Sequence, residues 1–144
     1  MNFPEPVAGL VVRYSYLWHD DKIAGAVEGS KDRPAAIVMR KVQENGHPDL
    51  VFVLPITHTE PKAPTVGVAI PWAVARATGL DDIPQWVVVS EVNYFNWPGY
   101  DLRADPKTGR IAYGMLPKTF FGEVHAAMVR QIHTKAMKTS KRTE

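Results

Sequence analysis

The apolar residues of this 144-residue chain come in short runs of valine, isoleucine and aromatic residues, each bounded by glycine, proline or asparagine. Runs of this length and composition are typical of β-strands. The runs that we assign to strands cover residues 9–18, 35–39, 50–57, 66–70, 86–92 and 110–115. Because helices do not alternate with these runs, a Rossmann-like sheet is disfavoured, and a small β-barrel or sandwich is expected.

The two central runs are predicted to form a hairpin. Asn45-Gly46 is a strong turn signal, and it lies between residues 35–39 and residues 50–57. The second run is apolar at almost every position, which indicates burial on both faces of the sheet. In the run before them, Tyr14, Tyr16 and Trp18 alternate and should share one face.

Two segments have helical patterns. Residues 71–79 begin with proline and end with glycine, which is the asymmetry of a short helix. After Pro117, apolar residues recur at spacings of three and four, namely Phe121, Val124, Met128 and Ile132. We therefore expect a mainly β domain with a C-terminal helix. Residues 19–32 have no period and predict a long loop.

The length favours one domain that spans residues 1–144. The chain has no cysteine, which excludes disulfides and thiolate chemistry and fits a reducing compartment. The N-terminus has no secretory pattern, and no apolar run approaches the about 20 residues of a membrane span. Lysine and arginine gather near the end of the chain, so residues 138–144 are predicted to be a disordered basic tail.

Three polar clusters interrupt the apolar runs, and the first is Lys31-Asp32-Arg33-Pro34. Proline restricts Arg33 to extended geometry, so its guanidinium is held at the mouth of a buried strand. A planar guanidinium held in this way suits a phosphate. The alternative is an ion pair between Arg33 and Asp32 or another nearby acid.

The second cluster is Thr57-His58-Thr59, which ends a buried strand. Histidine is the usual proton-transfer group near neutral pH. Strand alternation places the two hydroxyls on one face and His58 on the other. The alternative is that Thr57 and Thr59 cap the backbone of the loop and that His58 is solvated.

The third cluster covers residues 91–103 and interleaves aromatic residues with amides and an arginine. Such side chains can stack on RNA bases and hydrogen-bond to their edges. The alternative is that Phe95 and Tyr100 belong to the core and that Trp97 packs on the proline of its turn.

Taken in order, these segments resemble the MazF/PemK/Kid family of toxin ribonucleases over about residues 9–133. The sharpest matches are the Arg-Pro-Ala opening at residues 33–35 and the Pro-Ile-Thr ending at residues 55–57. Further matching segments are Gly9–Val12, Gly79–Leu80, Trp86–Glu91, Asp101–Arg103 and Tyr113–Leu116. The chain departs from the family at Leu10, where an acidic residue is usual, and in its longer loop and Asn93–Gly99 stretch.

The resemblance implies a small SH3-like barrel of the MazF/CcdB type, found as a homodimer in the bacterial cytoplasm. It implies cleavage of single-stranded RNA without a metal or another cofactor, and a cognate antitoxin whose disordered tail blocks the RNA groove. Arg33 matches the catalytic arginine of the family, and Thr57 matches its catalytic threonine. Glu91 and Arg103 match polar positions of the strand that follows.

The chemistry implied is transesterification, in which the ribose 2′-hydroxyl attacks its own 3′-phosphate. Arg33 would stabilise the developing charge, Thr57 would orient the phosphate, and the base would be His58 or Glu91. Candidates for substrate binding are Trp18, Thr59, Asn93, Trp97 and Arg103. Two alternatives are a non-catalytic barrel that binds RNA or a protein, and a toxin of the same fold that targets a protein such as gyrase.

Overall fold

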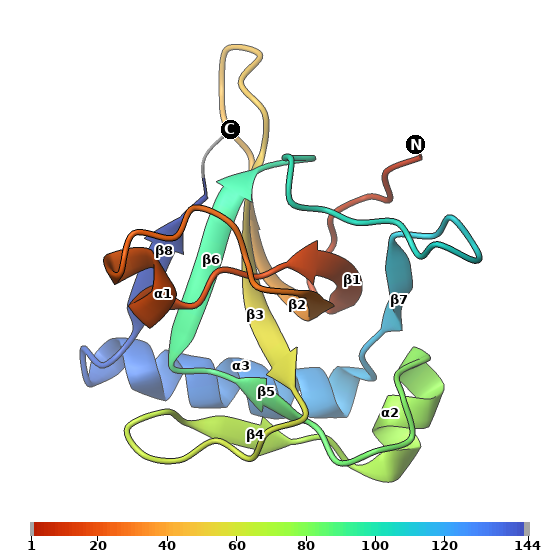
Figure 1. The fold of residues 1–144 in the computed structure, drawn as a ribbon, viewed down its shortest axis with the longest axis vertical. Helices are drawn as coiled ribbons and strands as arrows, with labels where there is room; N and C mark the ends of the chain where they lie inside the picture. The colour runs from red at the N-terminus through yellow and green to blue at the C-terminus, as the bar shows by residue number, and fades with distance from the viewer. Residues whose placement is uncertain (1, 143–144) are drawn as a thin grey trace.

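The structure is a computed structural model that describes residues 2–142, in which a long helix lies along one side of a curled set of strands (Figure 1). The strands are β1 (Leu10–Ser15), β2 (Asp32–Lys41), β3 (Leu50–Thr57), β4 (Gly67–Ala69), β5 (Trp86–Val88), β6 (Glu91–Asn96), β7 (Ala112–Met115) and β8 (Lys138–Lys141). The helices are α1 (His19–Ile23), α2 (Trp72–Thr78) and α3 (Lys118–His133). Among residues 2–142, none of these helices has the length and apolar character that a bilayer crossing would need.

The strands form one curled sheet that resembles half of a barrel (Figure 1). Its order is β4-β5-β3-β2-β1-β7, and β6 joins it beside β3 and carries β8 on its other edge. Neighbouring strands are antiparallel except β6 and β8, which are parallel. The expectation of a mainly β fold is therefore confirmed.

The predicted hairpin is present, and it forms the centre of the sheet. β2 and β3 pair in antiparallel register, with Ala36 opposite Leu54 and Ile37 opposite Val53. The first pair packs towards α3, and the second pair packs into a separate cluster on the other face. Because both faces are covered, the continuous apolar run of β3 is buried on both sides, as predicted.

Aromatic side chains fill much of the cluster on the face away from α3. The rings of Tyr14 and Phe95 stack with their centroids 5.0 Å apart. Tyr16 meets Tyr14 edge-on at 6.3 Å and meets Trp18 edge-on at 5.1 Å. The alternation of Tyr14, Tyr16 and Trp18 thus places them in one continuous row of rings, as expected.

The helices follow their sequence signals closely. α2 ends at Gly79, whose φ of 83° gives the left-handed cap that glycine adopts without strain. The buried stripe of α3 contains Phe120, Val124 and Met128, whereas Ile132 is half exposed. The predicted stripe is therefore right at its centre and drifts at both ends.

Three segments differ from expectation. Residues 19–32, predicted to be a loop, begin with the short helix α1, whose first turn carries Asp20 and Asp21, and acidic residues stabilise the start of a helix. The run at residues 86–92 is divided into β5 and β6, because β5 pairs with the end of β3 and β6 pairs with its start. The expected disordered tail is ordered over Lys138–Lys141, which lie as strand β8 along β6. Arg142 is then buried, and residues 143–144 lie outside the described residues.

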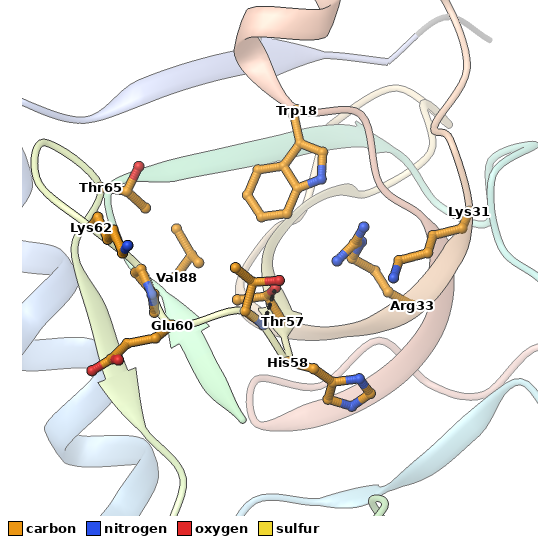
Figure 2. Close-up of a pocket in the computed structure, with 11 residues that line it drawn as sticks. Trp18, Lys31, Arg33, Thr57, His58, Glu60, Lys62, Thr65 and Val88 are labelled. Atoms are coloured by element: carbon orange, nitrogen blue, oxygen red, sulfur yellow. Dashed lines mark hydrogen bonds between the residues drawn. The ribbon is translucent and has the colours of Figure 1, made fainter. Parts of the chain in front are cut away.

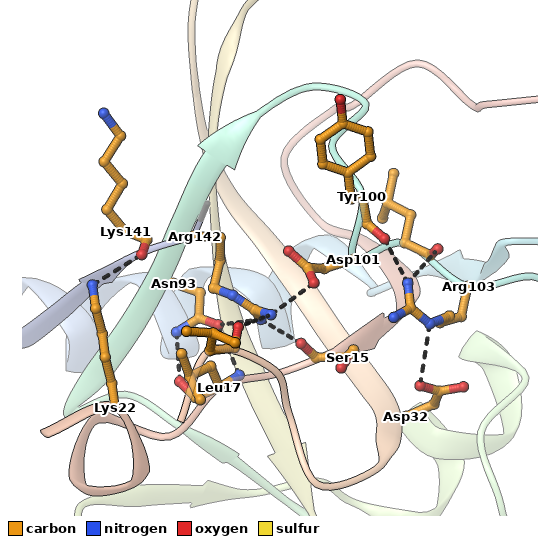
Figure 3. Close-up of polar contacts among 12 residues, drawn as sticks. Ser15, Leu17, Lys22, Asp32, Asn93, Tyr100, Asp101, Arg103, Lys141 and Arg142 are labelled. Atoms are coloured by element: carbon orange, nitrogen blue, oxygen red, sulfur yellow. Dashed lines mark hydrogen bonds and ion pairs between the residues drawn. The ribbon is translucent and has the colours of Figure 1, made fainter. Parts of the chain in front are cut away.

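The buried end of β8 is held by the guanidinium of Arg142 (Figure 3). It forms an ion pair with Asp101 at 2.7 Å and donates to the Asn93 side-chain oxygen at 3.3 Å and to the Ser15 carbonyl. The guanidinium carbon (Cζ) lies 5.5 Å from the centre of the Tyr14 ring. Because the charge is paired and hydrogen-bonded, its burial is tolerated, and the strand is fixed at its end.

We expect Arg142→Met to lower the free energy of unfolding by about 3 kcal/mol or more, because it removes one member of a buried ion pair while the Asp101 charge stays. The matched control is Lys141→Ala, whose side chain is exposed in the same strand and whose loss should change stability by less than about 0.5 kcal/mol. Urea denaturation of both variants measures the difference, and equal stabilities would show that Arg142 does not hold the strand.

Candidate functional site

A cleft of about 560 Å³ opens where β2 begins and β3 ends (Figure 2). The residues that line it are Trp18, Lys31, Arg33, Thr57, His58, Thr59, Glu60, Pro61, Lys62, Thr65 and Val88. Five of them are candidates named from the sequence, namely Trp18, Arg33, Thr57, His58 and Thr59. The fold thus brings the first two polar clusters and one aromatic candidate together.

The pairing of the central hairpin explains this convergence. Ala35 lies opposite Pro55, so the start of β2 and the end of β3 reach the same edge of the sheet. Arg33 precedes this pair by two residues, and Thr57 follows it by two. Because strand side chains alternate, both side chains emerge on the same side as their neighbours two positions away.

The guanidinium of Arg33 lies against the Trp18 indole, 5.1 Å from the ring centroid (Figure 2). Within residues 2–142 it makes no hydrogen bond or ion pair, and its Nε is buried without a partner. The alternative pairing with Asp32 does not occur, because Asp32 lies 3.7 Å from both Arg13 and Arg103. The charge of Arg33 is therefore available to a ligand.

Partial burial lowers the pKa of the Arg33 guanidinium from its ordinary value, because water solvates the cation less well there. Arginine nevertheless stays protonated at neutral pH, since its ordinary pKa exceeds about 12. A partly desolvated cation without a carboxylate partner is a favourable site for an anion, whose charge replaces the lost hydration.

Thr57 is buried, and its hydroxyl oxygen accepts a hydrogen bond from the Thr59 backbone N–H at 3.1 Å. The predicted capping role is thus present for this threonine. The hydroxyl proton of Thr57 donates to no other described residue, so it can point to a ligand in the cleft.

His58 lies on the wall of the cleft, and its ring points away from the Trp18 indole (Figure 2). Its side chain is 43% exposed, and Nε2 lies 4.0 Å from the Asp81 carboxylate. This orientation follows the alternation predicted from the sequence.

The cleft carries more positive than negative charge. Lys31, Arg33 and Lys62 line it, whereas Glu60 is the single carboxylate among the lining residues. The first polar cluster of the sequence includes Lys31, but neither Lys31 nor Lys62 was predicted from the sequence to be a site residue. The signal for both was a lysine within a few residues of a candidate, in a loop that follows or precedes a buried strand.

Glu91 and Asn93 are not among the residues that line the cleft. The Glu91 carboxylate accepts hydrogen bonds from the Tyr16 hydroxyl at 3.2 Å and from the His19 backbone N–H at 3.0 Å. Asn93 is fully buried and holds the backbone of Leu17, accepting from its N–H at 3.0 Å and donating to its carbonyl at 2.8 Å. Both side chains anchor the segment that follows β1.

Trp97 and Arg103 also lie outside the cleft lining. The Trp97 ring packs 6.1 Å from the buried Phe95, whereas Tyr100 is 76% exposed and is not core. Arg103 donates to the carbonyl oxygens of Tyr100 and of Leu102, at 2.6 Å and 3.2 Å. Within the third polar cluster, Trp97 and Arg103 therefore make contacts in and around their own turn.

No protein-family model matches this sequence, and a search of curated proteins finds no match. Within residues 2–142, no three histidine, aspartate or glutamate side chains lie together in a way that would hold a metal ion. The groups that the cleft lining offers to a ligand are three cations, hydroxyl groups, an imidazole, one carboxylate and an indole.

The anchoring role of Glu91 predicts a specific pH dependence. Burial raises the pKa of the Glu91 carboxyl, although the hydrogen bonds from His19 and Tyr16 oppose this shift. The folded state then holds the Glu91 proton more tightly than the unfolded state, so this group's contribution to stability falls as the pH rises through the folded pKa.

We therefore expect Glu91→Gln to gain stability relative to the unmodified protein between about pH 4 and about pH 7. Glutamine keeps an oxygen that can accept both hydrogen bonds, and it does not ionise. Urea unfolding of both proteins across this range measures the difference, which cancels the titration of all other groups. A difference that stays constant or reverses would contradict the assignment.

Proposed function

We propose that this protein is an endoribonuclease of the MazF/PemK type, which cleaves single-stranded RNA by metal-independent transesterification. The observation that carries the proposal is the Arg33 guanidinium, which lines a basic cleft together with Thr57 and has no ion-pair partner among residues 2–142. A cation, a hydroxyl donor and a partly exposed indole match the phosphate and the base of a nucleotide.

The proposal extends to the fold and the partners that the resemblance implies. The curled sheet with its helix would be an SH3-like barrel, and the protein would act as a homodimer in the bacterial cytoplasm. The excess of lysine and arginine around the cleft favours an antitoxin with an acidic disordered segment, because opposite charges would hold that segment over the site.

In the proposed reaction, the ribose 2′-oxygen forms a bond to phosphorus, and the bond from phosphorus to the 5′-oxygen breaks. The 2′-hydroxyl proton passes to a base, and another proton reaches the leaving 5′-oxygen. The products are a 2′,3′-cyclic phosphate and a 5′-hydroxyl. Arg33 would stabilise the charge on the phosphoryl oxygens, and Thr57 would hydrogen-bond to one of them.

For the base, the contacts favour His58 over Glu91. His58 lines the cleft beside Thr57 and has a carboxylate, Asp81, near its Nε2. The Glu91 carboxylate is outside the lining and already accepts two hydrogen bonds from the protein. To act as the base, the exposed His58 ring would have to rotate towards the substrate, since it points away from the Trp18 indole (Figure 2).

For substrate binding, Trp18 and Thr59 have the strongest support. The exposed part of the indole can stack on a base, and Lys31 and Lys62 can approach neighbouring phosphates. Asn93, Trp97 and Arg103 are committed to contacts within the protein, so direct contact with RNA at this cleft is disfavoured for them.

The second candidate is a non-catalytic module that binds RNA in the same cleft. The observation in its favour is that the two candidate bases are withdrawn, with Glu91 engaged by Tyr16 and His58 turned aside. Binding of single-stranded RNA without products would support this alternative. A toxin that acts on a protein such as gyrase would instead show neither activity on RNA.

The test is incubation with a long single-stranded RNA in EDTA, followed by mapping of the product ends. We expect discrete cuts that bear 2′,3′-cyclic phosphate. Arg33→Ala should slow cleavage by about a hundredfold or more, because one preorganised donor to a developing oxyanion has an effect of this size. Thr57→Val should slow it less, since it removes a neutral donor.

The matched control is Arg130→Ala, which removes an exposed arginine on α3 that is outside the cleft. Its cleavage rate should stay within about twofold, apart from a small uniform effect of net charge. If the cleavage rates of Arg33→Ala and Arg130→Ala agree, Arg33 is not catalytic. Intact RNA with the unmodified protein would favour the binding module.

A further inference from the structure

The cleft shares one wall with a second, smaller cavity. Lys31, Arg33 and His58 line both spaces. The second cavity has a volume of about 180 Å³, and its other lining residues are Arg13, Asp32, Pro34, Ile56, Asp81 and Tyr113. Arg33 therefore stands between two hollows of the surface, and the described cleft accounts for one of them.

Tyr113 is one of the residues that line the smaller cavity. β7 carries it beside β1, since Ala112 pairs with Val12, and its ring packs partly on the core around α3. A further hollow of about 260 Å³ shares Arg13, Asp81 and Tyr113 with this cavity. Burial raises the pKa of the Tyr113 phenol, so its hydroxyl remains a hydrogen-bond donor across the neutral range.

The polar lining of the smaller cavity differs from that of the cleft. It contains two carboxylates, Asp32 and Asp81, beside its three cations, whereas the cleft contains one. Arg13 lies 3.7 Å from Asp32 and 4.0 Å from Asp105, which are ion-pair distances beyond normal hydrogen-bond length. Donors and acceptors are thus mixed, which suits the edge of a base better than a second phosphate.

We propose that the smaller cavity is a second base-binding subsite, so that the site takes a strand of at least two nucleotides across Arg33. One base stacks on Trp18, the phosphate between the nucleosides lies at Arg33, and the neighbouring base enters the cavity beside Tyr113. This inference rests on the proposed function in taking single-stranded RNA as the ligand. It adds Tyr113 as a residue that contacts substrate.

The test compares ligands with one base and with two. The probes are nucleoside 3′,5′-bisphosphates and 2′-O-methyl dinucleotides with a phosphate at each end, each used as a mixture of the four bases. The 2′-O-methyl group removes the attacking hydroxyl, so binding is measured without cleavage. Isothermal titration calorimetry gives the affinities of the unmodified protein and of the Tyr113→Leu, Tyr113→Phe and Trp18→Ala variants.

We expect the two-base ligand to bind more tightly, and Tyr113→Leu to weaken that ligand by about tenfold with little effect on the one-base ligand. Tyr113→Phe keeps the ring and should retain most of the gain. Trp18→Ala should weaken both ligands. Leucine preserves apolar packing on the core, and a thermal melt confirms that each variant is folded.

The outcomes separate this inference from the proposed function. If the gain from the second base survives Tyr113→Leu, or if Tyr113→Leu weakens both ligands equally, the subsite is overturned, even when the protein cleaves RNA. If the gain depends on the Tyr113 ring while long RNA stays intact, the subsite stands and the nuclease proposal falls. If neither ligand binds, the subsite is overturned, and the nuclease proposal is decided by the cleavage of long RNA alone.

Discussion

The antiparallel pairing of β2 with β3 is the constraint on which the rest of this structure depends. It provides the centre of the sheet, with one face packed on α3 and the other on the aromatic cluster. The same register brings Arg33 and Thr57 together at the open end of the hairpin, where β2 begins and β3 ends. The core and the candidate site are therefore two results of one set of backbone hydrogen bonds, and a slip of one residue would disrupt both.

The second wall of the cleft is built in a different way. Trp18 follows Leu17, whose N–H and carbonyl are both held by the buried amide of Asn93. Asn93 in turn accepts from the Arg142 guanidinium, which also pairs with Asp101. The position of the indole thus depends on side chains from β6 and from the end of β8, although none of these touches the cleft.

The parts of the fold that could be predicted from sequence are those with a local signal. The apolar run of residues 50–57, the Asn45-Gly46 turn and the Pro71–Gly79 helix each follow from short-range preferences. The same holds for Arg33 and Thr57, because each sits at the end of a clear strand. β8 has no such signal, since its Lys-Thr-Ser-Lys sequence is polar and its order depends on the distant partners of Arg142.

The candidate site shows the same limit. Glu91 is a candidate base and Asn93 a candidate for substrate binding when the sequence is taken alone. Strand alternation does not predict the hydrogen bonds by which Tyr16 and Leu17 occupy their side chains. Trp97 and Arg103 are likewise held by contacts with Phe95 and with nearby carbonyl groups. Conversely, Lys62 and Tyr113 lie far from Arg33 in the sequence, and only the folded arrangement of the strands brings them to the two hollows that Arg33 lines.

One wall of the cleft carries Arg33 and Thr57, and the other carries Trp18. The contacts that hold these two walls in place differ in their separation along the sequence. The β2–β3 hairpin joins near neighbours in the sequence, whereas the hydrogen bonds of Leu17 to Asn93 and of Arg142 to the Ser15 carbonyl join segments far apart. Local contacts form early in folding, and remote ones form late. In the native state, the contacts that form last are the first to open. Amide protons of β8 and of the segment before Trp18 should therefore exchange together, while those of β2 and β3 stay protected. The position of the Trp18 wall therefore depends on contacts made from β6 and from the residue after β8, whereas the wall formed by Arg33 and Thr57 depends on the β2–β3 hairpin.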